Sequence, residues 1–133
     1  MAEAGKRYFN IEEASLAISI IRPLIAQILE IRQNILDKQP EVWPVVSKTA
    51  GNGGSKAASL IVQDFARLDE LVHQVQSTGA ILKDINLGLV DFLSISNGRE
   101  IFLCWQYGEP DLAFWHEIEA GFNGRQPISS LND

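Results

Sequence analysis

The residues with the greatest chemical potential lie in the last third of this 133-residue chain. Asp91, Glu109 and His116 carry groups that could bind a metal ion or transfer protons. Arg125 has a planar fork of donors that could hold an anionic substrate, and Cys104 is the only thiol. One histidine with scattered carboxylates lacks the ligand spacing of a zinc site, so these residues alone name neither a metal nor a reaction.

The same residues allow a structural and a catalytic interpretation. In the structural one, which we favour, Asp91 lies among apolar neighbours on a strand and pairs with Arg125, because a buried carboxylate requires a partner. His116 is then a hydrogen-bonded structural histidine, and Cys104 is a small buried apolar residue. In the catalytic one, Asp91, Glu109 and His116 serve a metal-assisted or acid/base hydrolase.

A third hypothesis is ligand binding without catalysis. Trp105, Trp115 and Phe122 could form an aromatic pocket for a small molecule, with Arg125 as a further binding residue. The sequence does not indicate a cofactor for any of the three hypotheses.

The element that positions most of these residues is a β-hairpin. Apolar residues dominate 87–95 and 99–106, and Asn97-Gly98 between them predicts a tight type I′ turn. In the register that this turn imposes, Asp91 lies on one face together with Cys104 on the opposite strand. The other face, expected to cover the helices, carries Val90, Phe92, Ile101, Leu103 and Trp105.

Further strands are expected on both sides of this hairpin. Residues 81–85 predict a third short strand before it. Residues 112–118 fit either an aromatic-rich strand or a short helix, and the pattern does not decide between them. The glycines in 121–127 would let the tail turn back onto the sheet.

Two amphipathic helices precede the sheet. Asn10 and Glu13 have the spacing of a capping box, and isoleucines and leucines then recur three and four residues apart. Pro23 removes one backbone hydrogen bond, so a kink is expected near it. A second helix follows at 58–78, with Gly79 as its C-terminal stop. The apolar stripes of these helices favour burial against a sheet or a second subunit.

A long connection at 39–56 separates the helices, and its prolines and glycines predict a flexible segment. Trp43 within it is expected to cover the helices. Gly53-Gly-Ser-Lys56 has some likeness to a phosphate-binding loop but lacks the Walker spacing. An ordinary connector capped by Ser55 is the favoured interpretation.

Length and charge restrict the class of protein. The chain suits a single domain, and its net charge of −6 without a basic stripe argues against nucleic acid as a partner. The apolar run at 16–31 is interrupted by Arg22 and Glu30, which argues against a membrane span. No secretion signal is apparent at the start, and one cysteine fits a reducing compartment, so we expect a cytoplasmic protein.

Several motifs resemble those of a known family: Gly88-Leu-Val-Asp-Phe92, Leu103-Cys-Trp105, Gly108-Glu109, Trp115-His116 and Gly121-Phe-Asn-Gly-Arg-Gln-Pro127. With them, nearly the whole chain resembles a small uncharacterised prokaryotic family, a domain of unknown function. Some of its members carry a label of cell-division initiation. The resemblance implies no activity, cofactor or catalytic residue, and the helices here are too short for a long coiled-coil scaffold.

The sequence therefore predicts a single α+β domain over residues 1–133. It consists of an antiparallel two-helix hairpin at 10–78, including the flexible connection, packed on a small antiparallel sheet of three to four strands within 80–133. The favoured function is a cytoplasmic interaction or assembly module that forms a homodimer, with the polar cluster in a structural role.

Overall fold

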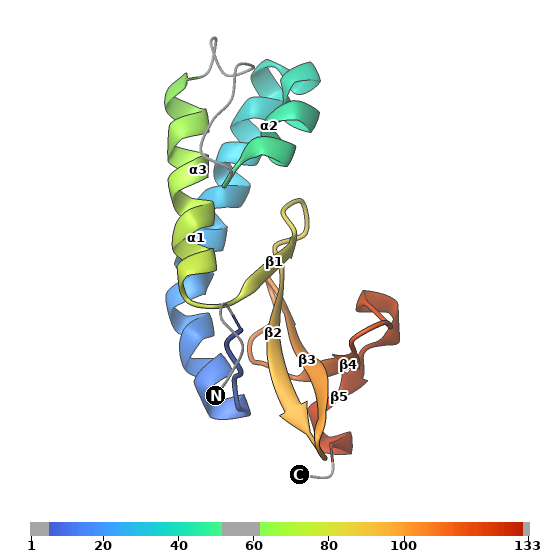
Figure 1. Cartoon of the computed structure of the whole chain (residues 1–133). Helices are drawn as coiled ribbons and strands as arrows, with labels where there is room; N and C mark the ends of the chain where they lie inside the picture. Colours follow the sequence, from blue (N-terminus) through green and yellow to red (C-terminus); the bar gives the residue numbers. More distant parts are fainter. Residues whose placement is uncertain (1–5, 52–61, 132–133) are drawn as a thin grey trace.

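The computed structural model describes residues 6–51 and 62–131 of the chain. These residues form two layers, with long helices on one side and an antiparallel sheet on the other (Figure 1). The predicted α+β class is confirmed. The described part of the chain contains three α-helices and a five-stranded sheet, in place of the predicted two helices and three to four strands.

The first helix, α1, spans Ile11–Lys38 and starts at the predicted capping box. The Asn10 side chain accepts a hydrogen bond from the Glu13 backbone N–H at 2.7 Å, and Glu13 Oε1 accepts one from the Asn10 N–H at 2.9 Å. The helix continues without interruption through Pro23, and the kink expected there stays a prediction. Its buried face carries Ala14, Ala17, Ile18, Ile21, Ile25, Ile28, Ile31 and Ile35.

On length and composition alone, α1 could cross a membrane, despite the two charges that argued against it in the sequence. Core helices of soluble proteins pass the same test. The apolar character of α1 has a local explanation in this domain, because its isoleucines pack into the core between the helices and the sheet. Four of them have no exposed surface: Ile21, Ile25, Ile28 and Ile35.

The prediction of an unstructured connection at 39–56 was wrong for its first half. A 3-10 turn at Pro40–Val42 leads into α2 at Trp43–Thr49. Both prolines lie in the first turn of these elements, where a missing N–H costs nothing. Trp43 is buried, as predicted, and its Nε1 donates to Asn86 Oδ1 at 2.9 Å. The loop predicted at 53–56 lies outside the described residues.

The helix α3 spans Val62–Ser77 and runs beside α1 in the opposite direction (Figure 1). The predicted start of this helix at residue 58 lies outside the described residues. Gly79 has a φ of +96°, which confirms the predicted helix stop. Leu71, which lies beside the main apolar stripe of α3, is fully buried within this chain.

The sheet is an antiparallel meander in the order β1-β2-β3-β4-β5 (Figure 1). The predicted turn is confirmed, with φ values of 53° at Asn97 and 80° at Gly98, and Ser96 pairs with Arg99. The region at 112–118, left open between strand and helix, contains a strand. The strands are β1 Ile81–Asp84, β2 Leu89–Ser96, β3 Arg99–Gln106, β4 Phe114–Glu117 and β5 Gln126–Pro127.

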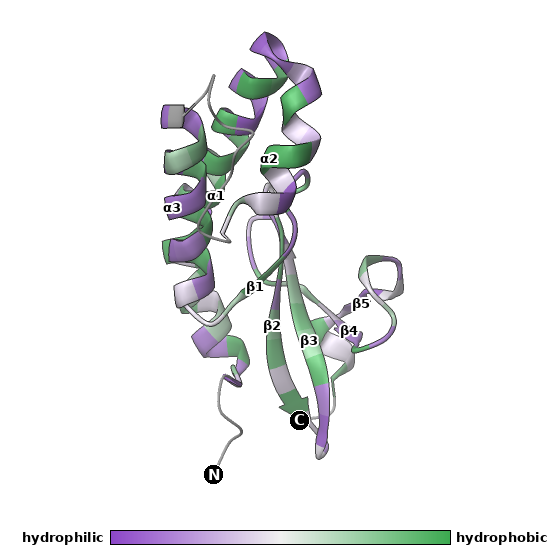
Figure 2. Cartoon of the chain, turned by 45° about the horizontal axis from the view of Figure 1, so that its top comes forward, coloured by the Kyte–Doolittle hydropathy of each residue, from purple (hydrophilic) through white to green (hydrophobic). Residues whose placement is uncertain are grey.

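The two faces of the sheet differ in what covers them. The face toward the helices is the predicted one, because its residues belong to the same core cluster as the α1 isoleucines. Figure 2 shows hydrophobic residues along β2 and β3. Trp115 pairs with Leu103 and shares that face, so His116 points to the opposite side with Asp91 and Cys104. The predicted inward residues are all fully buried: Val90, Phe92, Ile101, Leu103 and Trp105.

The edge of β2 is shared between two segments. β1 pairs with the first part of β2 and reaches Asp91. Beyond that point the segment before α1 takes over, because the Phe9 N–H donates to the Leu93 carbonyl at 2.7 Å. The Phe9 ring packs edge-on against Phe92, with 5.0 Å between centroids. Phe9, just before α1, is therefore part of the sheet layer.

Candidate functional site

Three neighbouring strands each contribute one polar residue to the outward face of the sheet. Asp91 of β2 lies opposite Cys104 of β3, and His116 of β4 pairs with Phe102, two residues before Cys104. Each of the three residues offers one atom that could bind a metal, and these three atoms lie within 4.8 Å of one another. Relative exposures are 2% for Asp91, 0% for Cys104 and 2% for His116. We call these residues the three-strand cluster.

The Asp91 carboxylate is paired with the His116 imidazole. His116 Nε2 lies 3.2 Å from Oδ1 and 3.1 Å from Oδ2 of Asp91, and Nδ1 lies 2.7 Å from the Glu117 carbonyl oxygen. Both ring nitrogens thus face oxygen acceptors. Both contacts are hydrogen bonds when Nδ1 carries one proton and a second lies between Nε2 and the carboxylate. With these two protons the pair is neutral overall, which reduces the cost of burying it.

The predicted pairing of Asp91 with Arg125 was wrong. The strands β3 and β4 lie between Asp91 and the tail, and His116 of β4 reaches the carboxylate first. The Arg125 Nη2 instead donates to the two carboxylate oxygens of Glu109, at 2.7 and 2.8 Å. Glu109 also accepts the backbone N–H of Gln106 at 2.7 Å. The tail is therefore fixed to the turn after β3.

The Arg125 guanidinium is also enclosed by aromatic rings. It lies 4.1 Å from the centroid of Phe114 and 4.7 Å from that of Phe122. With Glu109 bound on one edge and these rings nearby, Arg125 fastens the tail to the sheet rather than presenting a free anion-binding group. The predicted catalytic residue Glu109 is likewise engaged in this contact and does not belong to the three-strand cluster.

Cys104 is buried, as predicted, and its thiol is held in the protonated form. Burial, followed by the charge of Asp91 and a hydrogen bond to it, raises the pKa of the Cys104 thiol from 9.0 to about 12. A nucleophilic cysteine requires a lowered pKa and access to solvent. Without a bound cation, Cys104 therefore has neither property of a nucleophile.

We expect Cys104 in the native protein to resist a chromogenic disulfide reagent at neutral pH and to react fully in denaturant.

Because the pKa of the Cys104 thiol is raised in the folded protein, the stabilisation from the protonated thiol is complete below pH 9.0 and is lost as the pH rises to about 12. Denaturant unfolding of the wild type and Cys104→Ser across this range measures the difference. If Cys104 reacts with the disulfide reagent equally fast in native and denatured protein, its burial is contradicted.

The two tryptophans predicted to bind a ligand are core residues. Trp105 is fully buried on the inward face, and its Nε1 donates to the Glu109 carbonyl oxygen at 3.0 Å. Trp115 is also buried and donates to Ser130 Oγ at 2.9 Å. Trp105 therefore offers no surface to a ligand, which removes the basis for the predicted aromatic pocket with Phe122.

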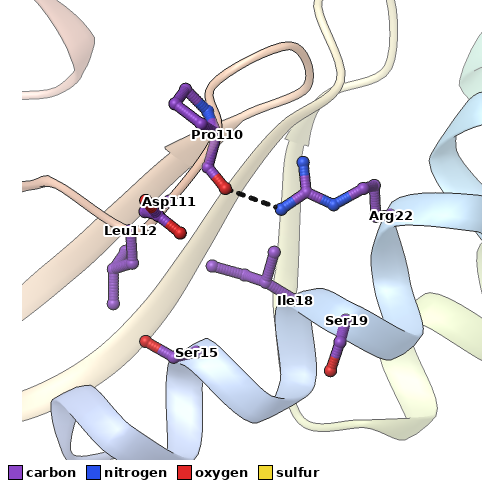
Figure 3. A pocket seen from close by; sticks show the side chains of 7 residues that line it. All are labelled: Ser15, Ile18, Ser19, Arg22, Pro110, Asp111 and Leu112. Carbon is purple, nitrogen blue, oxygen red and sulfur yellow. Dashed lines mark hydrogen bonds between the residues drawn. The ribbon is translucent and has the colours of Figure 1, made fainter.

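A small cavity of about 210 Å³ lies between α1 and the turn after β3 (Figure 3). Arg22 borders it and donates to the carbonyl oxygens of Glu109 at 3.2 Å and Pro110 at 3.0 Å. Its guanidinium also lies 5.2 Å from the Trp105 ring. Arg22 thus anchors the turn that carries Glu109. The cavity is lined by Ser15, Ile18, Ser19, Arg22, Pro110, Asp111 and Leu112.

Sequence reasoning missed the structural roles of Arg22 and Lys83. Lys83 Nζ lies 4.0 Å from Asp91 Oδ2 and 4.7 Å from the Phe102 ring centroid. The alternation of β1 would have placed Lys83 on the outward face once Ile81 was paired with Asp91. For Arg22 no local signal exists, because its partners are 87 and 88 residues away.

Comparison with known families identifies the family of this chain. A family model described as "Uncharacterized conserved protein (DUF2203)" matches residues 7–128. The chain belongs to this family. The DUF2203 match includes both layers of the fold and every residue of the three-strand cluster, and it confirms the predicted resemblance to a domain of unknown function. No curated protein and no solved structure matches the chain. Membership in DUF2203 assigns no activity.

Proposed function

We propose that this DUF2203 protein is an interaction module that assembles as a homodimer through α1. The observation that carries the proposal is a pair of large apolar side chains one helical turn apart: Leu16 is 65% exposed and Ile20 is 60% exposed. Together with Ala17 they line a groove of about 250 Å³, which we call the α1 strip. Single exposed apolar residues are ordinary, whereas a grouped set is typical of an interface.

The polar border of the α1 strip favours a second copy of this chain as its occupant. Arg7 and Glu13, of opposite charge, line the same groove. A two-fold axis through an interface brings each patch against its own copy, so Arg7 of one protomer can meet the Glu13 carboxylate of its partner. A surface that contains both an apolar strip and two opposite charges is self-complementary under such an axis.

The polar residues of the sheet support this structural interpretation over a hydrolase. Asp91 and His116 are buried and bonded to each other, so this acid/base pair is not open to substrate. Glu109 is occupied by Arg125. For location, the single free thiol supports a cytoplasmic module, and the net charge of −6 supports one that does not bind nucleic acid. The burial of the α1 isoleucines in the core supports a module that does not cross a membrane.

The oligomeric state of the purified protein tests this proposal. Light scattering and sedimentation are expected to give twice the monomer mass of 14.8 kDa for the wild type. Leu16→Glu and Ile20→Glu would each bury a charge in the interface, so we expect the dimer dissociation constant to rise at least about tenfold. Circular dichroism checks that each variant is folded.

Leu87→Glu is the matched control, because Leu87 is 45% exposed in the turn between β1 and β2 and does not line the α1 strip. It should leave the dissociation constant unchanged. A wild type that remains monomeric at high protein concentration would remove the dimer proposal. Equal weakening by Leu87→Glu would remove the α1 strip as its interface.

A further inference from the structure

We infer that the three-strand cluster is a binding site for a zinc ion. Asp91, Cys104 and His116 offer one oxygen, one sulfur and one nitrogen ligand, all within 4.8 Å of one another. Each comes from a different strand of one hydrogen-bonded sheet, so the backbone positions are fixed before any ion arrives. This inference is independent of the proposed dimer, which uses the other layer of the fold.

The spacing of the donor atoms suits a tetrahedral ion. Zinc–ligand bonds of about 2.0–2.3 Å place neighbouring tetrahedral ligands roughly 3.3–3.8 Å apart. In the cluster, His116 Nε2 and Asp91 Oδ2 are 3.1 Å apart, and the whole set is within 4.8 Å. Side-chain rotations that move the donor atoms by about 1 Å would therefore bring three ligands onto one ion, without moving the strands.

The donor types select the metal. Imidazole and thiolate are preferred by zinc and similar transition ions, whereas magnesium and calcium prefer sites made only of oxygen. His116 is already aimed by its second nitrogen, since Nδ1 contacts the Glu117 carbonyl oxygen at 2.7 Å. A bond of this kind fixes the ring of a metal-binding histidine and leaves Nε2 directed at the ion.

Charge balance removes the main objection to a buried ion. With a thiol on Cys104 and one proton shared between Asp91 and His116, the metal-free cluster is neutral. A zinc ion would displace these two protons into solvent, leaving one carboxylate, one thiolate and one neutral imidazole around a charge of +2. The site is neutral in both states, so binding buries no net charge.

Entry of the ion depends on Lys83, and its fourth ligand must come from solvent or another molecule. Lys83 is half-exposed and lies 4.0 Å from Asp91 Oδ2, so its ammonium group can move into water when the ion takes its place. Within the described ranges, the group contains no fourth ligand from a histidine, cysteine or acidic side chain. The fourth position would therefore be taken by water or an external ligand, as in zinc sites that keep one position open.

Cobalt(II) is the probe that tests the site. Cys104 is the only cysteine in the chain, so any thiolate-to-cobalt charge-transfer absorption reports this residue alone. Titration of metal-free protein with cobalt is expected to give this absorption with visible bands of tetrahedral cobalt, saturating at one equivalent. One equivalent of zinc should abolish both and raise the melting temperature of the full chain.

Two variants make the assignment specific. Cys104→Ser keeps a hydrogen-bond donor for Asp91 but should lose the charge-transfer band and most of the zinc-induced thermal shift. The matched control is His73→Gln, because His73 is the other histidine and is an exposed partner of Asp69; it should leave both signals unchanged.

Wild-type protein that shows no charge-transfer band would overturn the inference. So would a zinc-induced thermal shift of equal size in wild type and Cys104→Ser, since the ion would then bind elsewhere. If Cys104→Ser fails to fold, the wild-type cobalt spectrum still decides, because the chain contains no second thiol. The dimer is measured separately, by mass, so either proposal can fail alone.

Discussion

Replacement of His116 with leucine is expected to lower the free energy of unfolding by about 3–5 kcal/mol, measured by urea denaturation with a chelator present. The substitution leaves the Asp91 carboxylate buried on the sheet without its partner at 3.1 Å. The remaining cation, Lys83 at 4.0 Å, is too exposed to compensate in full. This loss would be large for a domain of 133 residues, whose total stability is of the order of 5–15 kcal/mol.

A double-mutant cycle provides the control. Asp91→Leu combined with His116→Leu removes both polar groups, and an apolar pair of similar size often restores most of the stability lost in a single variant. We therefore expect the double variant to lose less free energy of unfolding than the two single variants lose together, by at least about 1–3 kcal/mol. Additive effects would show that the two side chains do not form an energetic pair.

Replacement of Trp105 with alanine is expected to cost about 3–5 kcal/mol, because a large side chain leaves a cavity in a closed core. Trp105 has no exposed surface and lies on the inward face of β3. It also loses its hydrogen bond to the Glu109 carbonyl oxygen and its contact with the Arg22 guanidinium. Urea denaturation measures this cost as a lower free energy of unfolding, provided that the dependence of that free energy on urea concentration is unchanged.

Two further substitutions separate these contributions. Trp105→Phe retains most of the apolar volume and should lose clearly less stability than Trp105→Ala. Tyr107→Ala removes a partly exposed ring that packs edge-on against Trp105, with 6.2 Å between centroids, and should have a smaller effect still. A cost for Trp105→Ala no greater than that for Tyr107→Ala would contradict its place in the core.

The parts of the fold that the sequence predicted are those governed by local rules. Asn97 and Gly98 accept positive φ and thereby determine the register of β2 and β3, and the alternation of side chains then divides the faces. The cap of α1 depends only on residues three apart. The helix α2 was missed because two prolines were taken as breakers, although each lies in a first turn where proline is tolerated.

The candidate site was predictable only for the residues of β2 and β3, whose register the turn determines. The shared face of Asp91 and Cys104 followed from the hairpin, but His116 could be placed only once β4 was known to be a strand. Arg125 was assigned to the wrong carboxylate because its partner depends on the path of the tail past β4. Such choices are decided by tertiary geometry, which spacing along the chain does not report.

The way the chain closes the edge of β2 has a consequence for how copies of this protein can associate. With β1 on one part of β2 and Phe9 bonded to Leu93 on the next, a neighbouring molecule finds few unpaired backbone groups there for strand addition. Open-ended growth of fibres from that border is disfavoured. The proposed two-fold association through α1 would instead end at a dimer, which would keep the complexes discrete at high concentration.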